Sequence, residues 1–256
     1  MITPIPILLY HRVDHSGDPF SIGPDLFDQH LSWLANRGYR SLAATELSRV
    51  LADPHAPRPA KAVAITFDDG YADLATEVAP ALRRHGYQAT AFLITSLCPD
   101  EPGTDHEHLS WPEARDLSSE GVLELQSHTH SHGRWDVGPG DTARVMDDIG
   151  ASIEVLASKL GQPRSRFAHL AWPWGRTCED WEAAAADLGV TTQYVVQRGA
   201  ANRTGQHHRL PRLLLDGASV GQLAAWMALL SARPGALAVN SVFGTIRQLR
   251  RGAGYR

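Results

Sequence analysis

The chain has 256 residues, of which 43% are hydrophobic and 20% charged, and its formal net charge is −4 at pH 7. This composition is ordinary for a globular protein and excludes an intrinsically disordered chain, while the weak negative charge argues against a dedicated nucleic-acid binder, which needs a basic face. We expect one domain spanning 1–256, with the last ~20 residues a helical or flexible tail.

Hydrophobic periodicity predicts alternating strands and helices. Short apolar runs indicate strands at 5–9, 62–65, 89–94, 122–125, 167–171, 191–196 and 210–215. Apolar residues at helical spacing, closed by glycine or proline, indicate helices at 25–37, 72–85, 111–119, 141–160, 179–188 and 219–230. This alternation predicts an α/β fold, a complete or distorted (β/α) barrel of about seven parallel strands. In a barrel, site residues gather where the strands end.

Cysteine usage and the amino-terminal segment bear on the compartment. Cys98 and Cys178 are too few for a disulfide framework, and we expect both to be free. Residues 1–10 have no basic region, and Pro4 and Pro6 interrupt their apolar run, so they do not resemble a secretory signal. No stretch approaches the ~20 apolar residues of a membrane helix. We therefore expect a cytoplasmic protein.

Two adjacent carboxylates, Asp68 and Asp69, follow the predicted strand at 62–65. Neighbouring side chains at a strand end point in different directions, so the two carboxylates can take different roles. Gly70 permits a tight exit that a side chain would obstruct. The alternative is structural, an Asp-Asp-Gly turn that caps the helix beginning at Ala72.

Three histidines lie close together after the next predicted strand but one, in Ser127-His-Thr-His-Ser-His-Gly133. Neutral imidazole is a good ligand for zinc and its neighbours. His128 and His132 would share a face on one helical turn, and His130 would join them on a continued strand. With Asp69, His128 and His132 form a two-histidine, one-carboxylate site with open positions for water and substrate. The alternative is a solvated polar loop.

Together, the two motifs resemble a known family. Thr66-Phe-Asp-Asp-Gly70 and His128-Thr-His-Ser-His132 are similar, in order and in position at strand ends, to the first two motifs of the polysaccharide deacetylases, carbohydrate esterase family 4. The resemblance covers residues 5–215, most of the chain. It implies that Asp68 is a general base and that the metal ligands are Asp69, His128 and His132. His130 matches a variable family position and is not expected to be a ligand. Zinc is the expected ion, and cobalt, nickel and iron suit the same donors.

The third motif departs from the usual family pattern. Most members have an Arg-x-Pro-Tyr-like segment, whereas this chain has Leu170-Ala-Trp-Pro-Trp-Gly175, with Ala171 at the arginine position. This form resembles the branch that deacetylates poly-β-1,6-N-acetylglucosamine. The resemblance implies that the backbone N–H of Trp174 stabilises an oxyanion. We also expect Trp172 and Trp174 to wall a sugar-binding cleft, and two core tryptophans in a Pro-Gly turn are the alternative.

The same branch also indicates which residue is the general acid. Many family members supply a histidine near the carboxyl end, but no histidine follows His208 here. The branch instead carries an early Tyr-His pair, which in this chain ends in His11, so the resemblance assigns His11 as general acid. His207 and His208 are the alternatives. Arg212 is expected to replace the missing motif-three arginine by pairing with Asp68, although a surface arginine is the equal alternative.

The resemblance implies a metal-dependent hydrolase that removes N-acetyl groups from poly- or oligo-N-acetylglucosamine or from a sugar conjugate. An amidohydrolase acting on a small non-sugar amide and a non-catalytic carbohydrate-binding protein on the same scaffold are the alternatives. The aromatic segment 172–174 favours a sugar, and the absence of a secretion signal favours a small cytosolic substrate. The expected partner is an N-acetylated amino sugar, without nucleic acid or a membrane span.

Overall fold

The computed structural model describes residues 3–252, except 54, 104–105, 135–141 and 203–206. Seven parallel strands form a closed barrel, because β1 pairs with both β11 and β5. Around the barrel the strands are β1 (Ile5–Tyr10), β11 (Leu210–Leu214), β9 (Thr192–Val196), β8 (His169–Ala171), β7 (Leu123–Ser127), β6 (Ala89–Leu93) and β5 (Ala62–Phe67). The predicted (β/α) barrel is therefore confirmed.

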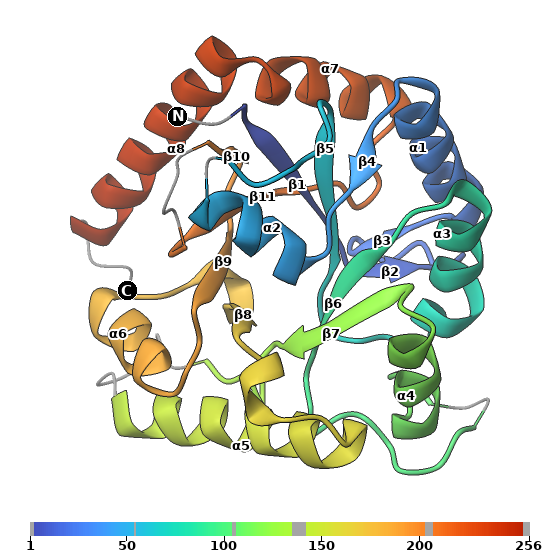
Figure 1. The fold of residues 1–256 in the computed structure, drawn as a ribbon, viewed down its shortest axis with the longest axis vertical. Coiled ribbons are helices and arrows are strands. Elements are labelled where there is room, and N and C mark those ends of the chain that lie inside the picture. Colours follow the sequence, from blue (N-terminus) through green and yellow to red (C-terminus); the bar gives the residue numbers. More distant parts are fainter. Residues whose placement is uncertain (1–2, 54, 104–105, 135–141, 203–206, 253–256) are drawn as a thin grey trace.

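Helices surround the barrel (Figure 1). The predicted helices are present as α1 (Pro24–Asn36), α3 (Ala79–His85), α4 (Trp111–Ser119), α5 (Thr142–Leu160), α6 (Glu179–Asp187) and α7 (Val220–Ser231). A π-helical turn, η1 (Leu74–Val78), leads into α3. The last helix, α8 (Arg233–Gly252), docks on the short strand β10 (Ala200–Ala201), where the Asn240 side chain bonds both backbone groups of Ala200. The tail is thus helical as far as residue 252.

One helix that the sequence analysis did not predict, α2 (Ala44–Ala52), closes the amino end of the barrel. Its buried residues Leu47, Val50 and Leu51 pack into a core with residues from the first halves of β1 and β5, such as Ile5 and Ala62. Helix α2 therefore covers this end, and the paired aspartates and the histidine segment that follow β5 and β7 lie at the other end. In this nine-residue helix only a few apolar positions mark the buried face, too few for periodicity to reveal it.

Short elements complete the fold. The extra strands are β2 (Arg12–Val13), which pairs with β3 (Ser21–Ile22), and β4 (Arg40–Ser41), which extends the sheet beside β5. The described part of the chain also has two 3-10 turns, η2 (Arg164–Arg166) and η3 (Pro173–Gly175). Cys98 and Cys178 are both free, as predicted. Within the described residues, no helix combines the length and hydropathy needed to span a membrane.

Candidate active site at the carboxyl end of the barrel

Side chains from four strand ends meet at one mouth of the barrel. His11 follows β1, the two aspartates follow β5, His128 follows β7, and Trp174 follows β8. Because parallel strands end at the same edge, residues more than a hundred positions apart become neighbours. The cluster lies opposite the end closed by α2.

Three donor atoms converge on one point of this mouth. Oδ1 of Asp69 lies 3.3 Å from Nε2 of His128 and 3.6 Å from Nε2 of His132. One donor atom from each of the three residues lies within 4.8 Å of the others. Asp69 Oδ1 is buried and has no hydrogen-bond partner among the described residues. A buried carboxylate oxygen without a partner is costly, and a shared cation would satisfy it.

The backbone bends sharply to bring these ligands together. Asp69, Thr129, His132 and Trp174 all have positive φ, between 54° and 70°. This left-handed conformation is unfavourable for residues with a side chain, and such strain concentrates at functional sites. Gly70 has φ of 77° and lies so close to the Leu93 side chain that a Cβ would stand 2.7 Å away from it, which confirms the tight exit expected after the aspartates.

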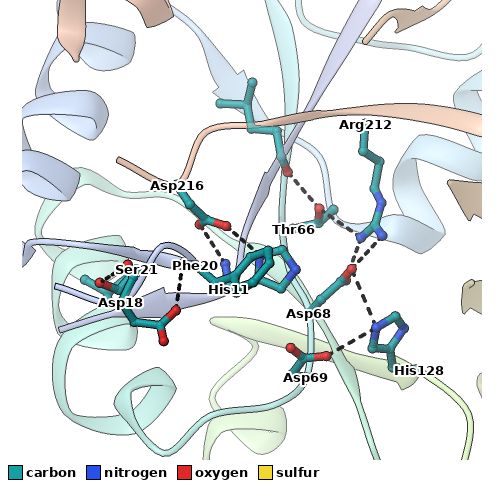
Figure 2. A network of polar contacts seen from close by, with 12 residues as sticks. His11, Asp18, Phe20, Ser21, Thr66, Asp68, Asp69, His128, Arg212 and Asp216 are labelled. Carbon is teal, nitrogen blue, oxygen red and sulfur yellow. Dashed lines mark hydrogen bonds and ion pairs between the residues drawn. The ribbon is translucent and has the colours of Figure 1, made fainter. Parts of the chain in front are cut away.

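Hydrogen bonds behind the ligand cluster hold the ring of His128 and the backbone of His132. Nδ1 of His128 lies 2.8 Å from the carbonyl oxygen of Ala171. Since a carbonyl only accepts, Nδ1 carries the proton and Nε2 is left with its lone pair toward Asp69 (Figure 2). The backbone N–H of His132 donates to the Thr129 hydroxyl. This loop therefore presents both imidazoles to the same point.

His130 faces away from the ligand cluster. Its Nδ1 lies 2.9 Å from the Thr95 hydroxyl, and its backbone N–H donates to Asp148 of α5. The N–H of Ser131 donates to the same carboxylate oxygen. Asp148 thus anchors the loop, while the His130 side chain lies outside the group that can hold a metal.

Asp68 is paired with Arg212, as expected, and both side chains are buried. The two terminal nitrogens of Arg212 each donate to one oxygen of Asp68 at 2.6 Å. Burial alone would raise the pKa of Asp68, but the charge and the hydrogen bonds of Arg212 hold it below its ordinary value. Asp68 is therefore an ionised carboxylate beside the ligand cluster.

His11 lies on the side of Asp68 that faces away from Arg212 and His128, and it is held by Asp216 (Figure 2). The Asp216 carboxylate accepts from the His11 backbone N–H at 3.0 Å and lies 2.6 Å from Nδ1. Burial opposes protonation of His11, but the Asp216 hydrogen bond and the charges of Asp68, Asp216 and Asp69 raise its pKa above the ordinary value. Nδ1 is engaged by Asp216, so Nε2 is the nitrogen available to a ligand.

The two tryptophans of the third motif have different environments. Trp174 is 50% exposed and its ring lies 5.1 Å from that of His132. Trp172 is completely buried, donates from Nε1 to Gln193 and packs on Trp181. Trp172 has no surface to offer a sugar, so its prediction as a cleft wall is wrong. It is the core tryptophan that the structural alternative described.

The alternative acids lie far from the site. His207 and His208 directly precede β11 and therefore stand at the amino end of the barrel, opposite the ligand cluster. The His207 carbonyl accepts from Gln193 near the start of β9. Among the predicted candidates, the structure brings only His11 to Asp68 and Asp69.

Sequence reasoning missed Asp216, which is the partner of His11. The only available signal was its position, directly after the apolar run of the last predicted strand, where barrel site residues occur. A lone aspartate before Gly217 reads equally well as a turn residue. The 205 residues that separate it from His11 hide the pairing.

The sequence is similar to those of known proteins. The sequence model of the family described as "Polysaccharide deacetylase" matches residues 55–193. The protein of Bacillus subtilis (strain 168) named "Putative polysaccharide deacetylase YxkH" is 29% identical over 209 residues, which are 82% of this chain and 70% of that protein. The poly-beta-1,6-N-acetyl-D-glucosamine N-deacetylase of Staphylococcus aureus (strain MSSA476) is 20% identical over 77% of this chain and 68% of its own length.

Solved structures share the fold. The deacetylase PplD of Streptococcus pyogenes, in complex with acetate, superposes with a TM-score of 0.78 at 24% identity, covering 89% of this chain and 99% of that one. IcaB from Ammonifex degensii superposes with a TM-score of 0.77, also at 24% identity, covering 88% of this chain and 97% of its own. At this identity the likeness concerns the barrel itself.

Proposed function

The chain belongs to the polysaccharide deacetylase family, and from this premise we propose that it is a metal-dependent hydrolase that removes the N-acetyl group from an N-acetylated amino sugar. One observation carries the proposal: a metal-type donor cluster stands beside a buried, ionised carboxylate, with a polarised histidine on the other side. Hydrolysis of an amide needs these three parts, an electrophilic catalyst, a base and an acid.

Asp69, His128 and His132 would hold the divalent cation. The donor set fits, because the unpartnered, buried Oδ1 of Asp69 faces two imidazole nitrogens. The hydrogen bond from Nδ1 of His128 to the Ala171 carbonyl sets the tautomer of that ring. When bound, the cation supplies Lewis-acid chemistry, polarising an acyl oxygen and making water more acidic. Zinc is the proposed ion, and cobalt, nickel and iron suit the same donors.

Asp68 acts as the general base in this proposal. Arg212 keeps the carboxylate ionised and fixes its plane through two hydrogen bonds. Asp68 Oδ2 also lies 3.7 Å from His128 Nε2, so the base stands against the ligand cluster. A water molecule between them would lose its proton to Asp68 as it attacks the acetyl carbon.

His11 acts as the general acid. Amine expulsion from a tetrahedral intermediate requires a proton on nitrogen. The carboxylate of Asp216 favours the protonated imidazole and fixes the ring by holding Nδ1, which points Nε2 toward the site. The backbone N–H of Trp174 is proposed to stabilise the oxyanion, as in the branch that the third motif resembles.

The amino-sugar substrate is inferred from one exposed aromatic ring and from the relatives. Trp174 presents half of its surface beside His132, where the apolar face of a pyranose can pack against it. The Staphylococcus aureus relative is named for poly-β-1,6-N-acetylglucosamine. We propose an N-acetylglucosamine oligomer or conjugate as the substrate.

The test measures acetate release from N-acetylglucosamine oligomers by protein that has been chelated and then reloaded with zinc or cobalt. We expect release only after reloading, and none from an Asp68→Asn variant that still binds one ion per chain by calorimetry. Tight binding of one ion without acetate release from any N-acetylated sugar would contradict the proposal. Release that is indifferent to chelation would contradict the metal dependence.

A further inference from the structure

A buried histidine outside the catalytic cluster joins the two segments that carry His11 and Asp216. His30 lies in α1 and is completely buried. Its Nδ1 is 3.0 Å from the Tyr10 hydroxyl, and its Nε2 is 2.9 Å from the carbonyl oxygen of Ala218. Tyr10 immediately precedes His11, and Ala218 follows Asp216 by two residues.

The hydrogen-bond roles at His30 follow from its partners. The Ala218 carbonyl can only accept, so Nε2 of His30 carries the proton. Nδ1 is then an acceptor, and the Tyr10 hydroxyl donates to it. Burial lowers the pKa of His30, which keeps the ring in this neutral, donor-and-acceptor form.

Rigid packing surrounds both bonds. The Tyr10 ring lies 5.3 Å from Phe27 and 5.7 Å from Phe67, so the tyrosine cannot swing without disturbing the core. The backbone N–H of Ala218 donates to Leu215, which closes the turn containing Asp216. His30 is therefore a polar link between β1 and that turn, built inside an apolar layer.

We propose that His30 is a positioning residue for the His11–Asp216 pair, setting the distance between the strand end that carries the acid and the turn that carries its carboxylate. This inference rests on the proposed function, in which His11 protonates the leaving amine. A leucine at this position would fill the space but would leave the Tyr10 hydroxyl and the Ala218 carbonyl without their bonds. The two segments would then be held only by packing, and the 2.6 Å contact between His11 and Asp216 would loosen.

The test compares two substrates that differ in leaving group. An N-acetyl amino sugar expels an amine and needs the acid, whereas an aryl acetate expels a phenolate that needs no proton. In His30→Leu we expect amide turnover to fall by about 10- to 100-fold, the scale of a misplaced catalytic group, with little change in aryl acetate turnover. His30→Gln, which can both donate and accept, should recover part of the loss.

The matched control is Leu156→Ala in α5, another completely buried residue far from this link, and it should leave the ratio of the two rates unchanged.

A second measurement does not depend on turnover. The proton between His11 Nδ1 and Asp216 should give a downfield NMR resonance in the wild type that is absent from Asp216→Asn. We expect this resonance to broaden or move in His30→Leu and to stay in place in Leu156→Ala. Equal losses on both substrates, or an unmoved resonance in His30→Leu, would overturn the positioning role. A wild type without amide hydrolysis would instead overturn the proposed function, and the resonance would still decide the role of His30.

Discussion

Arg212 and Asp68 form a buried, two-pronged ion pair, with each terminal nitrogen of the arginine 2.6 Å from one carboxylate oxygen. Arg212 lies two residues before Leu214, the end of β11, and Asp68 directly follows β5, so the pair crosses the barrel interior. The guanidinium also lies over the Phe92 ring, 5.3 Å from its centroid. The ion pair with Arg212 therefore fixes the plane, the charge and the position of the Asp68 carboxylate.

Removing Arg212 should therefore damage both stability and catalysis. In Arg212→Met an ionised Asp68 remains buried without its partner, which costs about 3–5 kcal/mol of unfolding free energy. Without the arginine, burial raises the pKa of Asp68, so acetate release should fall most at low pH and recover as the pH rises. Urea unfolding and pH–rate profiles check these two outcomes.

Two further variants control this prediction. Arg212→Met combined with Asp68→Asn removes both charges and should regain part of the lost stability, while remaining inactive. Arg212→Lys keeps a charge but not the two-pronged geometry, and we expect an intermediate rate. Wild-type stability in the Arg212→Met single variant would show that the pair contributes nothing to folding.

The His11–Asp216 pair predicts a dependence on the leaving group. His11→Ala should lower amide turnover by about 10²- to 10⁴-fold, because the amine must leave without a positioned acid. Asp216→Asn should show a smaller loss of the same kind, since His11 keeps its place but loses its charged partner. Metal affinity, measured by calorimetry, should change little in both variants. Equal losses on amide and aryl acetate would argue against an acid role.

The histidine segment provides its own matched controls for metal binding. His128→Ala and His132→Ala each remove one of the converging donors, and each should lower zinc affinity by several orders of magnitude. His130→Ala, in the same segment, removes a side chain that bonds Thr95 and should keep one ion per chain. The d–d absorption of the cobalt-loaded protein reports the ligand set directly. Full occupancy in His128→Ala or loss of the ion in His130→Ala would contradict this assignment.

The barrel and most of the candidate site could be predicted from the sequence, because both depend on local patterns. Strands at 62–65 and 89–94 are short apolar runs, and each occurs within about one or two residues of its expected position. Asp68, Asp69, His128 and His132 lie in two compact motifs directly after strands. A barrel then brings such motifs together whatever the distance along the chain.

What the sequence could not predict depends on single contacts between distant segments. Asp216 and His30 are ordinary residues in a turn and in a helix, and only the closed barrel places them beside His11 and Tyr10. The two tryptophans of the third motif could not be told apart, because alternation at a strand end does not say which ring faces the core. Trp174 has a left-handed backbone conformation, and the next residue, Gly175, lies against the Val196 backbone. This turn directs the Trp174 ring outward.

That difference between the tryptophans predicts two distinct phenotypes. Trp174→Ala removes an exposed ring and should raise KM for oligomeric substrates while changing the unfolding free energy by less than about 0.5 kcal/mol. Trp172→Ala leaves a cavity and removes the donor to the Gln193 side-chain oxygen, and should cost about 3–5 kcal/mol. Urea unfolding and Michaelis–Menten curves on the two variants check this. An unstable Trp174→Ala, or an unchanged KM, would remove Trp174 from the substrate cleft.

A buried histidine at the amino end of the barrel predicts how stability depends on pH. His169, at the start of β8, is 3% exposed and lies 3.4 Å from the Tyr194 hydroxyl. Burial lowers its pKa from 6.5 to about 4. In the unfolded chain His169 therefore binds a proton below pH 6.5, whereas in the folded protein it binds one only below about pH 4.

The difference in bound protons determines how the unfolding free energy changes with pH. His169 contributes its full stabilisation above pH 6.5 and loses it as the pH falls toward 4, by at most about 1.4 kcal/mol per pH unit. In His169→Gln, which can still bond Tyr194 but does not titrate, unfolding free energy should decline less between pH 7 and pH 4.5. His208→Gln, at an exposed position near the same end, should decline like the wild type. Parallel curves for wild type and His169→Gln would show that this histidine is not the source of the acid sensitivity, because the other titrating groups cancel in the comparison.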